Sequence, residues 1–179
     1  MIKYRQKRTC LEMFKITEMN YKKVIAFFQK YEYCALALKI CYSFLPLLLF
    51  IGYPVLISYV IFCRPHDILK IILVPLGVFL LVSVLRRLIN EQRPYEKYGV
   101  QSLFGKTTKG QSIPSRHTAS AFIISLAMLY VSFDLGVAAL SVSLMITLSR
   151  VLAGVHFIRD VLAAMLISVL AGIVFFFLI

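Results

Sequence analysis

The sequence predicts an all-α membrane protein: a polytopic helical bundle of five spans, or six if an N-terminal helix also crosses, preceded by an amphipathic helix. The first observation is composition. Hydrophobic residues make up 60% of the 179 positions, charged residues only 16%, and the mean hydropathy is +0.85, which is more apolar than a soluble domain. The second is a series of long runs without charge. Helices are expected because lone strands cannot satisfy their backbone in lipid.

The uncharged runs supply the predicted spans. A hydrocarbon core takes about 20 helical residues, a length that the first and last runs reach or approach unaided. The other three reach it if their helices continue into the polar residues beside them. The five runs are residues 40–63, 71–85, 118–133, 135–149 and 161–179.

Residues 1–39 form a basic N-terminal segment, and residues 40–179 are predicted to be a single membrane-embedded domain. The first segment holds nine Lys or Arg against three Glu. Its apolar positions recur at helical spacing, which predicts a helix on the membrane surface with its Lys side chains among the headgroups. The residues expected on the apolar face are Val24, Phe27, Phe28, Tyr31, Ala35 and Leu38.

Basic residues also gather away from the N-terminus. Seven of the 20 Lys and Arg lie between residues 86 and 117, and few acids accompany them. Because these residues stand at the ends of apolar runs, they suggest an anion site more than a nucleic-acid surface. No metal site is expected, since the cysteines show no metal-ligand spacing. They are Cys10, Cys34, Cys41 and Cys63.

Three polar clusters stand at run ends that an up-and-down path places on one side of the membrane. Arg86 and Arg93 are seven residues apart, two helical turns, so both could grip one oxyanion. Residues 114–117 read PSRH and open the next run, where helix N–H groups suit phosphate. His156 and Asp160 are four apart, so the carboxylate could orient the imidazole. Taken singly, each has an ordinary reading as a snorkelling, capping or surface group.

Together the clusters resemble the type 2 phosphatidic acid phosphatase family, whose motifs are K-x6-R-P, P-S-G-H and S-R-x5-H-x3-D. Here they read R-x6-R-P at residues 86–94, P-S-R-H at 114–117 and S-R-x5-H-x3-D at 149–160. Two positions depart from the family: Arg86 replaces Lys and Arg116 replaces Gly. The motifs fall within residues 86–160 of the membrane domain.

The resemblance implies a mechanism without metal or other cofactor. His156 would attack phosphorus to form a phosphohistidine, Asp160 would orient and stabilise its imidazole, and His117 would protonate the leaving oxygen. Cationic groups would hold the phosphoryl oxygens. The phosphate ligands implied are Arg86, Arg93, Ser115, Arg116 and Arg150.

The resemblance also implies a lipid substrate and a location. Undecaprenyl diphosphate, phosphatidylglycerophosphate and phosphatidic acid are the candidate lipids for this compact, bacterial-type form. The family usually places its site on the extracytoplasmic side of the cell membrane. Membrane lipids are the only other partners expected, with no nucleic acid and no obligate protein partner evident. Two alternatives remain: a non-catalytic protein that binds or moves lipids on this scaffold, and a vanadate-dependent haloperoxidase.

Overall fold

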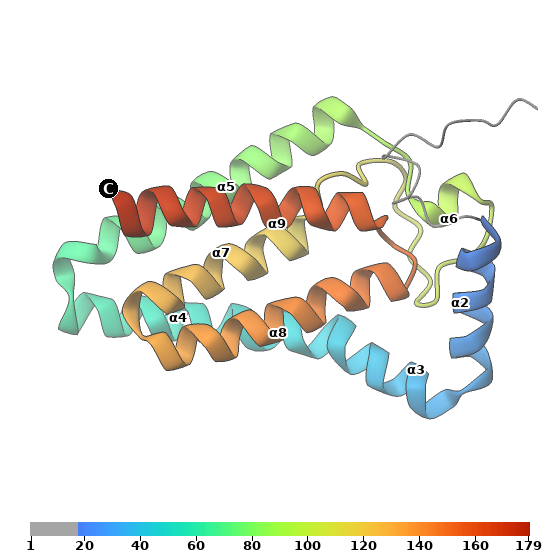
Figure 1. Cartoon of the computed structure of the whole chain (residues 1–179), viewed down its shortest axis with the longest axis horizontal. Coiled ribbons are helices and arrows are strands. Elements are labelled where there is room, and N and C mark those ends of the chain that lie inside the picture. Colours follow the sequence, from blue (N-terminus) through green and yellow to red (C-terminus); the bar gives the residue numbers. More distant parts are fainter. Residues whose placement is uncertain (1–17) are drawn as a thin grey trace, which may run out of the picture.

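The computed structural model describes residues 18–179, and the first 17 residues of the predicted N-terminal segment lie outside this range. Every regular element in the described part is a helix. Long helices run side by side along the length of the molecule (Figure 1), which confirms the all-α membrane bundle. The described elements are α2 (Glu18–Lys30), α3 (Glu32–Lys39), η1 (Ile40–Phe44), α4 (Leu45–Cys63), η2 (Pro65–Asp67), α5 (Ile68–Ile89), α6 (Pro94–Lys97), α7 (Arg116–Val131), α8 (Phe133–Leu152), α9 (Ile158–Gly172) and η3 (Ile173–Leu178).

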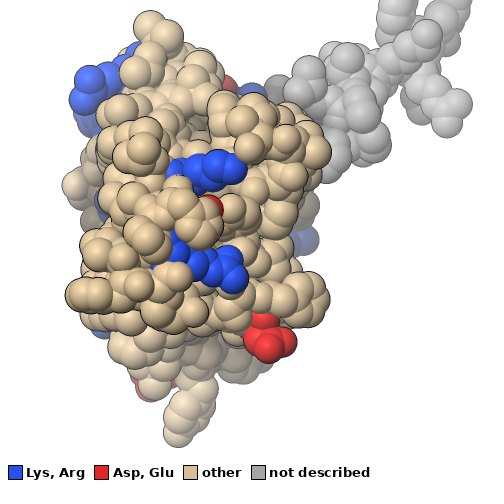
Figure 2. Space-filling model, turned by 90° about the vertical axis from the view of Figure 1, so that its left-hand side faces the viewer, with Lys and Arg blue, Asp and Glu red and all other residues tan. Residues whose placement is uncertain are grey.

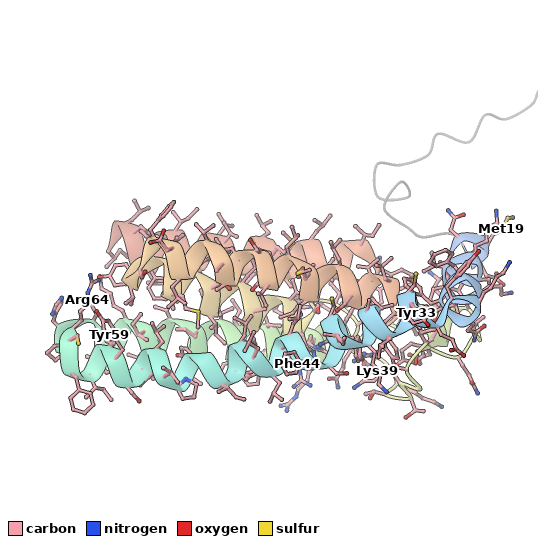
Figure 3. The ribbon with its side chains drawn as sticks, turned by 90° about the horizontal axis from the view of Figure 1, so that it is seen from below. Met19, Tyr33, Lys39, Phe44, Tyr59 and Arg64 are labelled. Carbon is pink, nitrogen blue, oxygen red and sulfur yellow. The ribbon has the colours of Figure 1, made fainter. Side chains whose placement is uncertain are left out.

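The first long helix is assembled from three pieces. Helix α3 continues through η1, a π-helical turn, directly into α4. Figure 3 follows this helix from Tyr33 to Arg64 at the other end of the bundle. A π-turn widens the helix locally and shifts its carbonyl groups out of the regular pattern, a feature often found at functional sites. Here it presents the backbone carbonyl of Tyr42 to another helix.

Four helical stretches are long and apolar enough to cross a membrane: Glu32–Cys63, Pro65–Lys97, Phe133–Leu152 and Ile158–Leu178. Helix α7 is shorter, at 16 residues. The described chain therefore has four to five candidate spans, and the number five remains a prediction.

Helix α7 forms the centre of the bundle. It packs against α4, α5, α8 and α9, and all its residues from 118 to 128 are buried. Small residues allow this close approach: a Cβ at Gly136 would strike the α7 backbone at Leu129. The hydroxyls of Ser125 and Ser143, 2.8 Å apart, join α7 to α8. This packing fixes the N-terminus of α7 at one end of the bundle.

Helix α2 lies across that same end (Figure 1). The chain leaves the helical conformation at Tyr31, with φ −113° and ψ 94°, so the predicted apolar face is divided between α2 and α3. The side chains that α2 buries are Tyr21 and Ile25, while Phe27 is exposed. The Tyr21 hydroxyl donates to the carbonyl of Gly154 at 3.4 Å. Gly154 has φ +71°, and a Cβ there would run into the Tyr21 ring.

Candidate active site

The three predicted polar clusters meet at the end of the bundle beside α2 and α6 (Figure 1). The end of α5, the start of α7 and the α8–α9 connection surround a small pocket of about 40 Å³. The lining residues are Tyr42, Arg86, Arg93, Lys106, Arg116, His117, Arg150, Val155 and His156.

His156 lies in the α8–α9 connection and is 2% exposed. Its Nδ1 is 3.5 Å from Oδ2 of Asp160, in the first turn of α9. The same oxygen accepts the backbone N–H of Phe157 at 2.9 Å and the hydroxyl of Ser112. One carboxylate therefore caps α9 and faces the imidazole. A proton on Nδ1 directed at this carboxylate leaves a lone pair on Nε2, as a nucleophile requires.

Arg86 and Arg93 line the pocket by a different path from the one predicted. Helix α5 ends at Ile89, and Asn90 is left-handed, with φ 44° and ψ 43°. Arg93 follows in extended conformation as the N-cap of α6. The prediction that both arginines share one helical face is therefore wrong, because the helix ends between them. They meet at the pocket because the chain turns back at Asn90.

The pocket floor consists of Arg86, Arg93 and Arg150, which are 3%, 5% and 4% exposed. Arg93 Nε donates to the carbonyl of Gly110 at 3.0 Å. Arg150 donates to the carbonyl of Tyr42 at 2.7 Å, with its guanidinium 4.0 Å from that ring's centroid. The Nε atoms of Arg86 and Arg150 are buried without a hydrogen-bond partner among the described residues. Since a buried cation is costly unless paired, the floor is suited to an anion.

The start of α7 contributes the outer part of the pocket. Arg116 and His117 line it and remain exposed. Ser115 is fully buried below them and is not among the lining residues. Its N–H donates to the carbonyl of Asp160 at 3.1 Å, and its hydroxyl accepts from Thr118 at 3.2 Å. Ser115 thus ties α7 to α9, and its predicted contact with phosphate remains a prediction.

Three residues that matter to this site were not identified in the sequence. Ser112 holds Asp160, Tyr42 holds Arg150, and Lys106 lines the pocket. Ser112 and Tyr42 are single polar or aromatic residues far along the chain from their partners, so no spacing rule marks them. Lys106 belonged to the basic stretch noticed in the sequence, which did not distinguish it from Lys109.

Two glutamates near the site, Glu91 and Glu96, hold the surrounding loops together. Glu91 forms an ion pair with Arg159. Glu96 accepts the backbone N–H groups of Gly110, at 2.8 Å, and Arg93, at 3.4 Å. Neither acid lines the pocket, so the floor keeps its positive charge.

The electrostatics keep the buried imidazole neutral. Burial and, to a smaller extent, Arg93 and Arg86 together lower the pKa of His156 from 6.5 to about 4, against the opposing effect of Asp160. The pKa of Lys106 is also lowered, first by burial and then by Arg93, Arg150 and the other cations of the pocket. His156 therefore presents a neutral imidazole at neutral pH, with Asp160 on one nitrogen and the positive charges of the pocket nearby.

Comparison with known proteins agrees with this geometry. The PAP2 superfamily matches residues 67–179, which contain all three clusters. Undecaprenyl-diphosphatase BcrC of Bacillus subtilis (strain 168) is 33% identical over 86 residues, covering 48% of this chain. The match covers 44% of that relative, so the chain matches less than half of the curated protein's length. The crystal structure of Aquifex aeolicus LpxE superimposes with a TM-score of 0.65 at 25% identity, covering 77% of this chain and 84% of that one.

Proposed function

Because this chain belongs to the PAP2 superfamily, we propose that it is an integral membrane phosphatase that removes phosphate from a lipid phosphomonoester or diphosphate through a phosphohistidine. The observation that carries the proposal is the buried, neutral His156 facing Asp160 on one side and three arginines on the other. A neutral imidazole is a competent nucleophile, and the guanidinium groups stabilise charge that shifts onto the phosphoryl oxygens.

In the first step, Nε2 of His156 attacks phosphorus while the bond to the leaving oxygen breaks. The leaving oxygen takes a proton from His117, whose ring lines the outer part of the pocket. The imidazole becomes positively charged as the N–P bond forms, and Asp160 stabilises this charge. The products of this step are the dephosphorylated lipid and phosphohistidine.

In the second step, water attacks the phosphorus and the N–P bond breaks. His117, now neutral, takes the proton from this water, which returns both histidines to their starting states. Arg86, Arg93 and Arg150 hold the phosphoryl group in both steps. No metal ion is needed here, since these cations supply the charge stabilisation that a metal ion supplies elsewhere.

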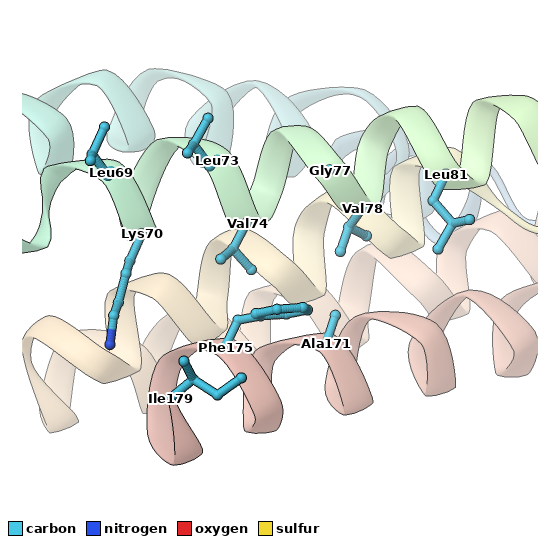
Figure 4. A pocket seen from close by; sticks show the side chains of 10 residues that line it. All are labelled: Leu69, Lys70, Leu73, Val74, Gly77, Val78, Leu81, Ala171, Phe175 and Ile179. Carbon is cyan, nitrogen blue, oxygen red and sulfur yellow. The ribbon is translucent and has the colours of Figure 1, made fainter.

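A lipid substrate is supported by the surroundings of His117. This ring also borders a narrow apolar cleft of about 10 Å³ that includes Leu49 and Phe50 of α4. Phe50 and Ile124 are shared with a second apolar cavity, of about 300 Å³, among α4, α5 and α7. The proton donor is therefore bordered by apolar side chains, two of which also line the larger cavity, as suits a lipid leaving group. A larger groove of about 550 Å³ lies between α5 and the end of α9 with η3 (Figure 4). It shares no lining residue with the site, so we do not assign the leaving group to it.

We place the site on the extracytoplasmic side of the cell membrane. The test uses a cysteine-free variant carrying one new cysteine, either at Thr107 beside the site or at Asp134 at the opposite end, both of them exposed. A membrane-impermeant maleimide should label the Thr107→Cys variant in whole cells and the Asp134→Cys variant only after lysis. The reverse pattern would place the site in the cytoplasm.

Purified protein assayed for phosphate release from lipid mono- and diphosphates in detergent micelles tests the activity. Release should persist in EDTA, and acid-labile phosphate should be trapped on wild-type protein but not on a His156→Gln variant. An inactive wild type that still binds these lipids would instead support a lipid-binding protein on the same scaffold. Activity that is lost in EDTA and restored by magnesium would overturn the metal-independent mechanism.

A further inference from the structure

The cations of the pocket form two tiers. Arg86, Arg93 and Arg150 are at least 95% buried and form the floor. Lys106 and Arg116 also line the pocket but are exposed, so they form its rim. No carboxylate is among the lining residues of the described chain. Five positive side chains thus border one small space, more than a single phosphoryl group needs.

We propose that Lys106 and Arg116 form a second phosphate subsite, which binds the inner phosphate of a lipid diphosphate while the outer phosphate occupies the arginine floor. This assignment rests on the proposed function and adds a substrate preference to it: diphosphate lipids over monophosphate lipids with the same tail. Hydrolysis then breaks the bond between the outer phosphorus and the bridging oxygen. Inorganic phosphate and a lipid monophosphate are released.

The direction of the reaction places the inner phosphate at the rim. In phosphoryl transfer the attacking and leaving atoms lie roughly in line on opposite sides of phosphorus. His156 attacks from its buried position, so the leaving oxygen points toward His117, which is exposed. In a diphosphate that oxygen carries the second phosphorus. Arg116 and His117 both line the pocket from the start of α7, which supports placing the Arg116 guanidinium on the leaving-group side.

Lys106 is held at the rim by its own loop. The hydroxyl of Ser102, a buried residue, accepts the backbone N–H of Lys106 at 2.5 Å and donates to its carbonyl at 3.2 Å. Both contacts use the backbone of Lys106, so neither one occupies the ammonium group that would bind a phosphate in the pocket. A change of the side chain alone therefore removes the charge and leaves the loop in place.

The charges around Lys106 explain why a second phosphate would be bound there. Partial burial is the largest cause that lowers the pKa of Lys106, and the positive charges of the arginines lower it further. These are Arg93, Arg150, Arg116 and Arg86. These like charges repel one another, and a ligand with more negative charge relieves more of that repulsion. A diphosphate carries more charge than a monophosphate and extends across both tiers.

The experiment compares kcat/KM for a diphosphate and a monophosphate of one prenyl alcohol, using Lys106→Gln, Arg116→Gln and the control Lys109→Gln. Lys109 is an exposed residue of the same loop outside the pocket lining. Each rim variant should lower kcat/KM for the diphosphate about tenfold, the worth of one charge-assisted hydrogen bond. It should lower the monophosphate value less, so that the preference falls. Lys109→Gln should match the wild type on both substrates.

Equal losses on the two substrates, or no loss on either, would overturn the second subsite. A companion measurement uses inorganic pyrophosphate and inorganic phosphate as ligands and records the rise in melting temperature in detergent. Pyrophosphate should stabilise the wild type more than phosphate does, and both rim variants should lose this difference. This measurement needs no turnover. If the wild type were inactive, the proposed function would be overturned, but the melting temperatures would still test the subsite. Equal stabilisation by both anions in the wild type would overturn the subsite.

Discussion

The two ends of the bundle are built from the same helices but differ in whether their buried polar atoms have hydrogen-bond partners. At the site end, five buried nitrogen or oxygen atoms have no hydrogen-bond partner among the described residues, on Arg86, Arg150, His156, Arg159 and Asp160. The opposite end, which faces the viewer in Figure 2, shows only a few charged side chains among uncharged ones. Its buried Asp67 accepts the hydroxyl of Tyr130 at 2.8 Å and lies 3.2 Å from Nε2 of His66.

The presence or absence of a hydrogen-bond partner within the protein distinguishes a structural polar group from one available to a ligand. The Asp67–Tyr130 hydrogen bond closes within the protein and ties the α4–α5 turn to α7. At the site end, the Nε atoms of Arg86 and Arg150 are buried without a partner among the described residues, at a cost that the protein itself does not recover. Changes at the site end should therefore alter catalysis more than stability, and changes at the opposite end should do the reverse.

The largest effect is expected at His156. A His156→Gln variant keeps a polar side chain but has no nucleophilic ring, so lipid phosphate release should fall by at least about 10⁴-fold. Tyr130→Phe, at the opposite end, should retain activity but lower the free energy of unfolding by about 1–3 kcal/mol, because Asp67 loses its donor. Phosphate release and thermal unfolding in detergent measure the two effects. Near-normal turnover by His156→Gln would refute the assignment of the nucleophile.

The next effect concerns the partner of the imidazole. Asp160→Asn retains the shape but removes the negative charge that stabilises the imidazolium formed during attack. A loss of about 10²–10⁴ in kcat is expected, by comparison with other carboxylate-oriented histidines. Single-turnover kinetics would separate this loss from weaker binding. An unchanged kcat would make Asp160 a helix cap only.

A smaller effect is expected at Tyr42, which supports Arg150 through its carbonyl and its ring. Tyr42→Leu removes the ring and keeps the carbonyl, so kcat/KM should fall about 2- to 30-fold, the range of one cation–π contact. Tyr59→Leu, an exposed tyrosine at the far end of the same continuous helix (Figure 3), is the matched control and should change little. If the two variants behaved alike, the contact between Tyr42 and Arg150 would have no part in catalysis.

The smallest effect is a pH dependence of stability. The pKa of His156 is about 4 in the folded protein and 6.5 as its ordinary value, so between these values the unfolded chain binds more protons than the folded one. Stability should therefore rise with pH across this window and be lost as pH falls below 6.5. Thermal unfolding between pH 7.5 and 5 should show a steeper decline for the wild type than for His156→Gln. Parallel curves would mean that His156 does not remain neutral in the folded protein.

The fold class could be predicted from the sequence because uncharged runs and lipid thickness determine it almost alone. The meeting of Arg86, PSRH and His156 could also be anticipated, since alternating spans bring those run ends together. The long connection between α6 and α7 could not be traced in advance, as its path depends on contacts such as Ser112 with Asp160, 48 residues away. The central position of α7 in the bundle could not be predicted either, because the sequence of an apolar helix is similar whether protein or lipid surrounds it.

The contact between Tyr21 and Gly154 limits how this sequence can evolve. Two independent causes keep position 154 a glycine: its φ of +71°, which side chains rarely adopt, and the Tyr21 ring, which fills the space of a Cβ. Shortening Tyr21 removes only the second cause, so an alanine at 154 would remain strained. The requirement for glycine at position 154 therefore does not depend on Tyr21 alone. A substitution at position 21 would not free position 154, so the loop that carries His156 requires its glycine whichever side chain α2 places against it.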